Sequence, residues 1–228
     1  MGIVFINGAG LNSSIWNDIK DNFHVPVLTI DLANKTKLTF DDYVNKVATE
    51  IENWKNDSFI IVAHSIGALV GLKVAERFNE KLKGFVAIGS FIPKKGQSFA
   101  SSLPFPQKIV LPILLSLLGT KPPKKSIATE LCNDLPPDTT LKIVNNFTPE
   151  AKALYTTKIN FDLPDTKRLY IKLTNDKTIT TDVQDEMIKR LNATDIKTIH
   201  SGHLPMLSKP DELTSILKEF MTAINFFA

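Results

Sequence analysis

Residues 58–71, SFIIVAHSIGALVG, constrain the fold of this chain more than any other stretch. Residues 59–62 are a continuous run of aromatic and β-branched side chains, which is typical of a parallel strand buried on both faces. After Ser65, apolar residues recur at near-helical spacing as far as Phe78. The sequence therefore predicts a strand, a tight turn that carries Ser65, and a helix.

Ser65 lies in the pentapeptide Ala63-His64-Ser65-Ile66-Gly67, which differs at one position from the G-x-S-x-G nucleophile elbow. In such an elbow the serine occupies a strained turn with its hydroxyl exposed above the sheet. We expect Ala63 and Gly67 to face each other where the strand passes into the helix, so both must be small. An ordinary strand-to-helix loop can also contain a serine, so the pentapeptide needs support from the rest of the chain.

Composition narrows the class of protein. The chain has 228 residues, 43% hydrophobic and 22% charged, as expected of a single globular domain. Its net charge is +3 with mixed signs, so we expect no nucleic-acid partner. A lone cysteine and four scattered histidines predict no disulfide, metal or cofactor. Because the chain starts directly with a strand pattern, we expect a cytoplasmic protein without a membrane span, of undetermined oligomeric state.

Apolar strand patterns alternate with helical patterns along most of the chain, which predicts an α/β fold with a mostly parallel sheet flanked by helices. The expected strands are residues 3–6, 25–30, 59–62, 84–89, 168–174 and 196–200. Capping boxes are expected at residues 39–42 and at residues 181–184, the second opening a helix with Val183 on its buried face. Pro210 is expected in the first turn of the last helix.

Residues 91–161 interrupt this alternation with many prolines and short helical pieces. We expect them to form a cap inserted after the fourth strand of a single domain, residues 1–228, because long insertions in compact folds are often functional lids. Within them, residues 109–118 are almost entirely apolar but too few to span a bilayer. We expect this run to pack against the main domain rather than to lie on a membrane surface.

Three residues that could form a catalytic triad follow apolar strands in the order Ser65, Asp176, His203. Loops beyond the carboxyl ends of parallel strands meet at one edge of a sheet, so these side chains can come together. A serine hydroxyl becomes a good nucleophile when a histidine takes its proton, and a buried carboxylate orients that histidine. We therefore predict that these three residues are catalytic.

Other histidines and aspartates fit these roles less well. The alternatives lie within a strand, within the elbow, or on the wrong side of a strand, whereas His203 follows a glycine in a loop that can reach over the sheet. These alternatives are His24, His64, His200, Asp162 and Asp165.

The chain also resembles a known family. Asn7-Gly8-Ala9-Gly10 after the first strand, followed by Trp16, resembles the oxyanion loop of α/β-hydrolases, with asparagine where histidine is common. This resemblance implies an α/β-hydrolase fold whose oxyanion hole is formed by the backbone N–H groups of Ala9 and Ile66.

Residues 203–213, HLPMLSKPDEL, closely resemble the plant methylesterase and hydroxynitrile lyase family and its bacterial relatives. Lyases of that family have a threonine beside the oxyanion loop and a lysine directly after the triad histidine. This chain has Gly8 and Leu204 there, which favours ester hydrolysis.

We therefore expect a serine carboxylesterase that acts on a small, largely apolar ester and needs no cofactor. Asn7, Gly8, His64 and Leu204 are predicted to lie around its substrate pocket. Two alternatives stay open: a hydroxynitrile lyase-like C–C lyase with the same triad, and a ligand-binding protein on a hydrolase fold.

Overall fold

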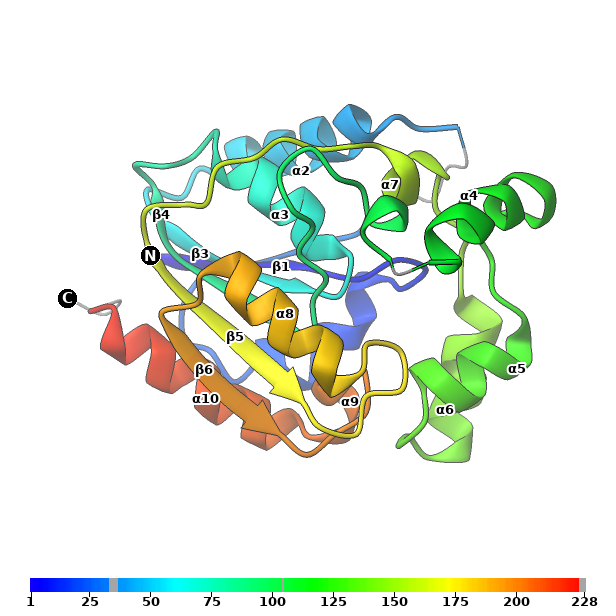
Figure 1. The fold of residues 1–228 in the computed structure, drawn as a ribbon. Coiled ribbons are helices and arrows are strands. Elements are labelled where there is room, and N and C mark those ends of the chain that lie inside the picture. Colours follow the sequence, from blue (N-terminus) through cyan, green and yellow to red (C-terminus); the bar gives the residue numbers. More distant parts are fainter. Residues whose placement is uncertain (33–36, 104, 226–228) are drawn as a thin grey trace.

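A computed structural model describes residues 1–32, 37–103 and 105–225. The chain forms a six-stranded parallel sheet with the strand order β2-β1-β3-β4-β5-β6 (Figure 1). The strands are β1 (Gly2–Ile6), β2 (Val27–Ile30), β3 (Phe59–His64), β4 (Leu82–Ile88), β5 (Lys167–Leu173) and β6 (Asp195–Ile199). The predicted parallel sheet is confirmed, with strand ends that differ by one or two residues from those expected.

β3 is buried along its whole length, and every one of its residues is inaccessible to solvent. Phe59, Ile61 and Ala63 belong to the hydrophobic cluster on one face of the sheet, whereas Ile60 and Val62 belong to the cluster on the other face. A strand covered on both faces has no polar side, which explains its continuous apolar run.

Helices cover both faces of the sheet (Figure 1). The first hydrophobic cluster contains residues of α2 (Phe40–Trp54), α3 (Gly67–Ala75) and α8 (Thr181–Leu191). The second contains residues of the 3₁₀ turn η1 (Ser13–Trp16), α1 (Asn17–Lys20), α9 (Pro205–Ser208) and α10 (Pro210–Ala223). The molecule is therefore a three-layer sandwich of helices, sheet and helices.

Several helix ends agree with the sequence patterns. Thr39 and Asp42 form the predicted capping box at the start of α2, where Asp42 N–H donates to Thr39 Oγ1 over 3.2 Å and Thr39 N–H donates to Asp42 Oδ2 over 2.8 Å. Pro210 is the first residue of α10, as predicted. The helix after the elbow is shorter than its pattern suggested, because α3 ends at Ala75 and the buried Phe78 follows in a turn.

The expected start of α8 is wrong. The helix is preceded by Thr180 without a side-chain capping bond, and Gln184 is buried against β5 instead of closing a capping box. Val183 is exposed, whereas Met187 and Leu191 face the core. A capping glutamine must turn back to the helix start, and here backbone groups of Leu173, at the end of β5, and of Ile179 bind its side chain instead.

The direction in which strands are added to the sheet reverses between β1 and β3. The chain places β2 on one side of β1, and β3 and all later strands on the other side. The loops that follow β1 and β3 therefore lie beside each other, at the place where parallel sheets form binding crevices. A β-carbon on Gly67 would come within 2.4 Å of the Asn7 carbonyl oxygen, so a glycine is required there. Ala63 and Gly67 were expected to face each other, but they have other neighbours. Gly67 packs on Asn7, and Ala63 lies opposite Gly71.

Residues 91–161 follow β4, and most of the helices in their described part lie beyond the carboxyl ends of the strands (Figure 1). We call them the inserted segment. It contains η2 (Ala100–Ser102), α4 (Gln107–Leu118), α5 (Lys124–Ser126), the π-helical turn η3 (Ile127–Leu131), α6 (Pro137–Asn146) and α7 (Ala153–Thr156).

Helix α4 contradicts the expectation that its apolar residues pack against the main domain. None of its residues is buried, and Leu117 and Leu118 are 75% and 77% exposed. The helix packs against the short turn η2 and projects from the side of the molecule (Figure 1). Nothing in the described part of the chain covers its outer face.

A buried carboxyl group connects the inserted segment to the main domain. Tyr43 of α2 donates its hydroxyl proton to Glu150 Oε2 over 2.8 Å and accepts a hydrogen bond from the amide of Ala151 over 2.7 Å. Glu150 is 1% exposed. Burial raises the pKa of Glu150 above its ordinary value of 4.5, because the charged form is poorly solvated there.

We predict that Glu150→Gln changes how stability depends on pH. A carboxyl group whose folded pKa is raised favours the folded state fully below pH 4.5 and loses that contribution as pH rises through the raised pKa. The free energy of unfolding of the wild type, minus that of the variant, should therefore fall as pH rises above 4.5 in urea titrations. Glu80→Gln, at an exposed residue, is the control; a constant difference for Glu150→Gln would contradict the prediction.

Candidate active site

Ser65 occupies the turn between β3 and α3 in a strained backbone conformation. Its φ is 54°, in the left-handed region that residues other than glycine rarely adopt. The turn is fixed by neighbouring backbone, since the Ser65 amide donates to the Ile88 carbonyl over 3.1 Å and the Phe91 amide donates to the Ser65 carbonyl over 3.4 Å. The nucleophile-elbow geometry expected from the sequence is present.

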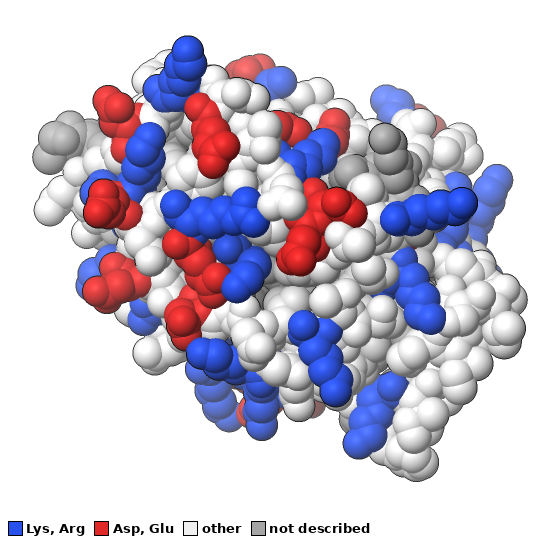
Figure 2. Space-filling model, turned by 90° about the horizontal axis from the view of Figure 1, so that it is seen from above, with Lys and Arg blue, Asp and Glu red and all other residues white. Residues whose placement is uncertain are grey.

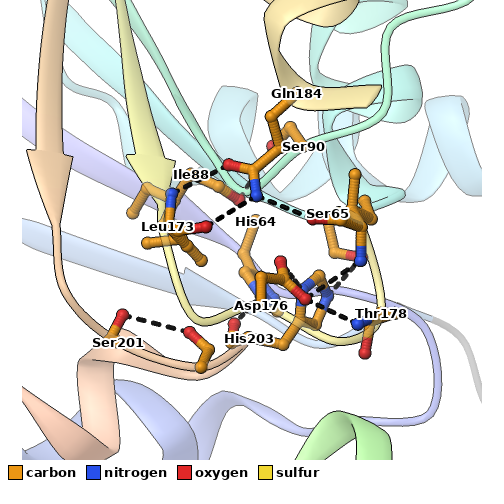
Figure 3. A network of polar contacts seen from close by, with 12 residues as sticks. His64, Ser65, Ile88, Ser90, Leu173, Asp176, Thr178, Gln184, Ser201 and His203 are labelled. Atoms are coloured by element: carbon orange, nitrogen blue, oxygen red, sulfur yellow. Dashed lines mark hydrogen bonds and ion pairs between the residues drawn. The ribbon is translucent and has the colours of Figure 1, made fainter. Parts of the chain in front are cut away.

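The three predicted triad side chains come together (Figure 3). His203 Nε2 lies 2.9 Å from Ser65 Oγ, and His203 Nδ1 lies 2.6 Å from Asp176 Oδ2. A carboxylate only accepts hydrogen bonds, so Nδ1 carries the proton and Nε2 is free to accept the serine proton. His203 and Asp176 are both buried, which removes competing water from this hydrogen bond.

The second oxygen of Asp176 fixes its orientation. Asp176 Oδ1 accepts hydrogen bonds from the amides of Thr178 and Ile179 over 2.7 and 2.9 Å. With Oδ2 on His203, the carboxylate has partners on both oxygens and cannot rotate away without losing one of them.

Gln184 supports the same loop and was missed as a site residue by the sequence analysis (Figure 3). Its Oε1 accepts from the Leu173 amide over 2.8 Å, while its Nε2 donates to the carbonyls of Leu173 and Ile179 over 2.9 and 2.7 Å. The side chain thus joins both ends of the loop that carries Asp176. Helical spacing alone does not indicate such a contact.

His64, next to the serine, holds the backbone of His203 in place. Its Nε2 lies 2.9 Å from the His203 carbonyl oxygen and must donate, because a carbonyl oxygen only accepts. Burial and the neighbouring His203 hold the pKa of His64 well below its ordinary value of 6.5, so the ring is neutral. Its Nδ1 is then unprotonated, and it is buried without a hydrogen-bond partner.

The loop after β1 is held by Asn7, which is fully buried. Asn7 Nδ2 donates to the carbonyls of Leu11 and Gly8 over 2.5 and 3.1 Å. A β-carbon at Gly8 would lie 2.9 Å from both His64 Nδ1 and Ser65 Cβ, so a larger residue would displace the site.

Ala9 and Ile66 lie beside the same space as the serine. Both residues line the cavity that also contains Ser65 and His203. In the described part of the chain, neither amide donates a hydrogen bond to another backbone group. Two free N–H groups beside a serine hydroxyl can stabilise an anionic oxygen.

The cavity above Ser65 has a volume of about 190 Å³ and is mainly apolar, with Glu130 as its one carboxylate among the described residues. The inserted segment supplies much of its wall: Phe99, Pro122, Ile127, Leu131, Phe147 and Tyr155. Across the ranges that the structure describes, no three His, Cys, Asp or Glu side chains are grouped so that they could hold a metal ion.

The four residues expected around the pocket are not part of this lining. Asn7, Gly8, His64 and Leu204 are buried beneath it, and Leu204 belongs to the hydrophobic cluster on the far face of the sheet. The sequence analysis named none of the wall residues of the inserted segment. They lie where the sequence shows no period, so no signal in a single sequence marks them.

The inserted segment also contacts the loops of the acid and the histidine. Asp134 Oδ2 accepts a hydrogen bond from the Gly202 amide over 2.5 Å, and Asn133 Nδ2 donates to the Asn175 carbonyl over 2.9 Å. Gly202 directly precedes His203, and Asn175 directly precedes Asp176. One short turn thus positions both loops.

Two curated proteins resemble parts of this chain. A carbendazim hydrolyzing esterase from Nocardioides sp. (strain SG-4G) is 33% identical over 67 residues, 29% of this chain and 28% of that protein. A pimeloyl-[acyl-carrier protein] methyl ester esterase from Wigglesworthia glossinidia brevipalpis is 30% identical over 95 residues, 40% of this chain and 36% of that protein. The chain thus matches only about a third of the length of these curated relatives.

Solved structures match over nearly the whole chain. An extracellular alpha/beta-hydrolase from a Paenibacillus species, described as homologous to Tobacco Salicylic Acid Binding Protein 2, has a TM-score of 0.86 at 19% identity and covers 96% of this chain and 98% of its own. A methylesterase from Arabidopsis has a TM-score of 0.76 at 16% identity, covering 97% and 99%. These confirm the predicted resemblance in fold. Because the family model for the alpha/beta hydrolase family also matches residues 3–216, this chain belongs to the alpha/beta hydrolase family.

Proposed function

We propose that this protein is a serine carboxylesterase that hydrolyses a small, largely apolar ester. One observation carries the proposal: the hydrogen-bonded series Ser65, His203 and Asp176 opens into an apolar cavity of about 190 Å³. The two curated relatives are both named as esterases, which supports the same reaction class.

In the acylation step, Ser65 Oγ attacks the acyl carbon while His203 Nε2 takes the hydroxyl proton. Asp176 stabilises the imidazolium that forms. The amides of Ala9 and Ile66 donate to the oxyanion, each contributing about 3 kcal/mol in sites of this kind. The intermediate collapses as His203 returns the proton to the leaving alkoxide, which releases the alcohol and leaves an acyl-enzyme.

Deacylation repeats these steps with water. His203 takes a proton from the attacking water, the same two amides hold the oxyanion, and the acid leaves as Ser65 regains its proton. The residues thus supply a nucleophile, a base that later acts as an acid, and an electrostatic site for the oxyanion.

We assign the inserted segment the role of a cap over this site. It supplies most of the apolar wall and contacts both catalytic loops, so it can orient an apolar acyl or alcohol group and exclude water. A cytoplasmic location belongs to the proposal as well. It is based on the single cysteine, although the similar Paenibacillus protein is described as extracellular.

We predict that Ser65→Ala lowers kcat for p-nitrophenyl butyrate by about five orders of magnitude, because no other group can form the acyl-enzyme. The free energy of unfolding should change by less than about 1 kcal/mol, since the hydroxyl contributes to chemistry rather than to the core. Stopped assays and urea titrations measure the two effects. Ser116→Ala, at an exposed serine, is the matched control; turnover near wild type in Ser65→Ala would place the nucleophile elsewhere.

We predict that Asp176→Asn lowers kcat by about 10⁴-fold with the fold intact, because the amide favours the wrong tautomer of the histidine. Asp162→Asn and Asp165→Asn are controls at exposed positions before β5, and both should keep wild-type turnover. If either control, and not Asp176→Asn, abolished activity, the acid would be wrongly assigned. Circular dichroism spectra verify folding.

We predict that short p-nitrophenyl esters are hydrolysed much faster than mandelonitrile is cleaved. Cyanohydrin cleavage leaves a cyanide anion, and no lysine or arginine lines the described cavity to stabilise it. The oxyanion of an ester is still held by backbone amides. Faster release of cyanide than of p-nitrophenol would favour the lyase, and tight ligand binding without any turnover would favour a binding protein.

A further inference from the structure

The outer face of α4 and Phe105, two residues before its start, form an unusual apolar surface. We call it the α4 surface: Phe105, Ile109, Val110, Ile113, Leu114, Leu117 and Leu118, which are 43% to 77% exposed. Only three other large hydrophobic residues are exposed in the described part of the chain, and they are scattered: Leu141, Val183 and Ile196. Apolar residues clustered in this way mark an interaction surface rather than the ordinary exposure of single side chains.

Positive charge flanks this surface along the chain, and Lys121 lines one hollow together with Leu118. Residues 105–125 contain four lysines and no aspartate or glutamate, and all four lysines are exposed: Lys108, Lys121, Lys124 and Lys125. A further lysine, Lys152, donates to Ser116 Oγ on α4. Figure 2 shows white surface interrupted by blue at the right-hand end of the molecule, where Figure 1 places α4. The partner of this surface must therefore accept both apolar side chains and cations.

We propose that the α4 surface docks on an anionic lipid membrane surface. Its apolar side chains would enter the boundary between headgroups and acyl chains, and the lysines would contact the anionic headgroups. A second copy of the chain fits less well, because an isologous contact would bring two patches of four lysines together. The partner is a surface and not a span: α4 has twelve residues, and no helix in the described ranges could cross a bilayer.

The position of α4 connects this docking to the cavity. Phe99 precedes α4 in the chain, Pro122 follows it, and both line the cavity above Ser65. A membrane bound at α4 would therefore lie beside the wall through which an apolar substrate would enter.

Vesicle flotation with the full chain tests this proposal. We expect the wild type to bind vesicles of phosphatidylcholine mixed with phosphatidylglycerol, and to bind vesicles of phosphatidylcholine alone at least about tenfold more weakly. Leu117→Ser/Leu118→Ser should weaken binding to the anionic vesicles by about tenfold or more. The control Leu141→Ser/Ile196→Ser removes two exposed apolar residues elsewhere, and it should bind as the wild type does.

A second pair of variants tests the charge. Lys124→Glu/Lys125→Glu should abolish binding to anionic vesicles, whereas Lys81→Glu/Lys83→Glu changes net charge equally at exposed lysines around the start of β4 and should not. Melting temperatures near that of the wild type verify that all variants fold. Vesicle binding is measured without turnover, so its outcome is independent of whether Ser65 hydrolyses an ester.

Three outcomes would overturn the proposal. The first is no binding to anionic vesicles, and the second is binding that survives the serine or the glutamate substitutions in α4 and after it. The third is a wild type that does not bind vesicles and is a dimer in light scattering, together with a Leu117→Ser/Leu118→Ser variant that is a monomer. A second copy of the chain would then cover the α4 surface.

Discussion

The left-handed backbone conformation of Ser65 is the constraint on which the site depends. It allows β3 to end and α3 to begin within a few residues, with the serine hydroxyl outside the sheet. So abrupt a turn brings the start of α3 close to the loop after β1. Only a glycine at position 67 leaves room there for the Asn7 carbonyl. The strain is held in place by β3, which is buried between two hydrophobic clusters and cannot shift to relieve it.

Around this fixed point, the other groups are positioned by buried hydrogen bonds. His203 is held by the Asp176 carboxylate at its ring and by the His64 ring at its carbonyl oxygen. Gln184 in turn holds the loop of Asp176. The side chains of Asp176, His203 and Gln184 would each be costly to bury alone, and each has a partner on every polar atom, so the arrangement is rigid before any substrate binds.

The sequence predicted the parts of the fold that depend on periodicity and on order along the chain. The continuous apolar run of β3, the capping box of Thr39, and the order of Ser65, Asp176 and His203 all carry local or topological information. Contacts between distant segments were not predictable: Gln184 followed a helical pattern but binds the end of β5, and Leu204 lies next to His203 in the chain but faces the core. The apolar run of α4 is equally compatible with burial and with exposure, because its composition does not say whether another element lies over it.

The two hydrogen bonds from Asn133 and Asp134 affect how a substrate can reach Ser65. These bonds attach a turn in the middle of the inserted segment to the loops that carry Asp176 and His203. If this turn moved away, both bonds would break, the two loops would lose this support, and the alignment between His203 and Ser65 would be disturbed. A route into the cavity that keeps this alignment must therefore leave the turn at Asn133 and Asp134 in place.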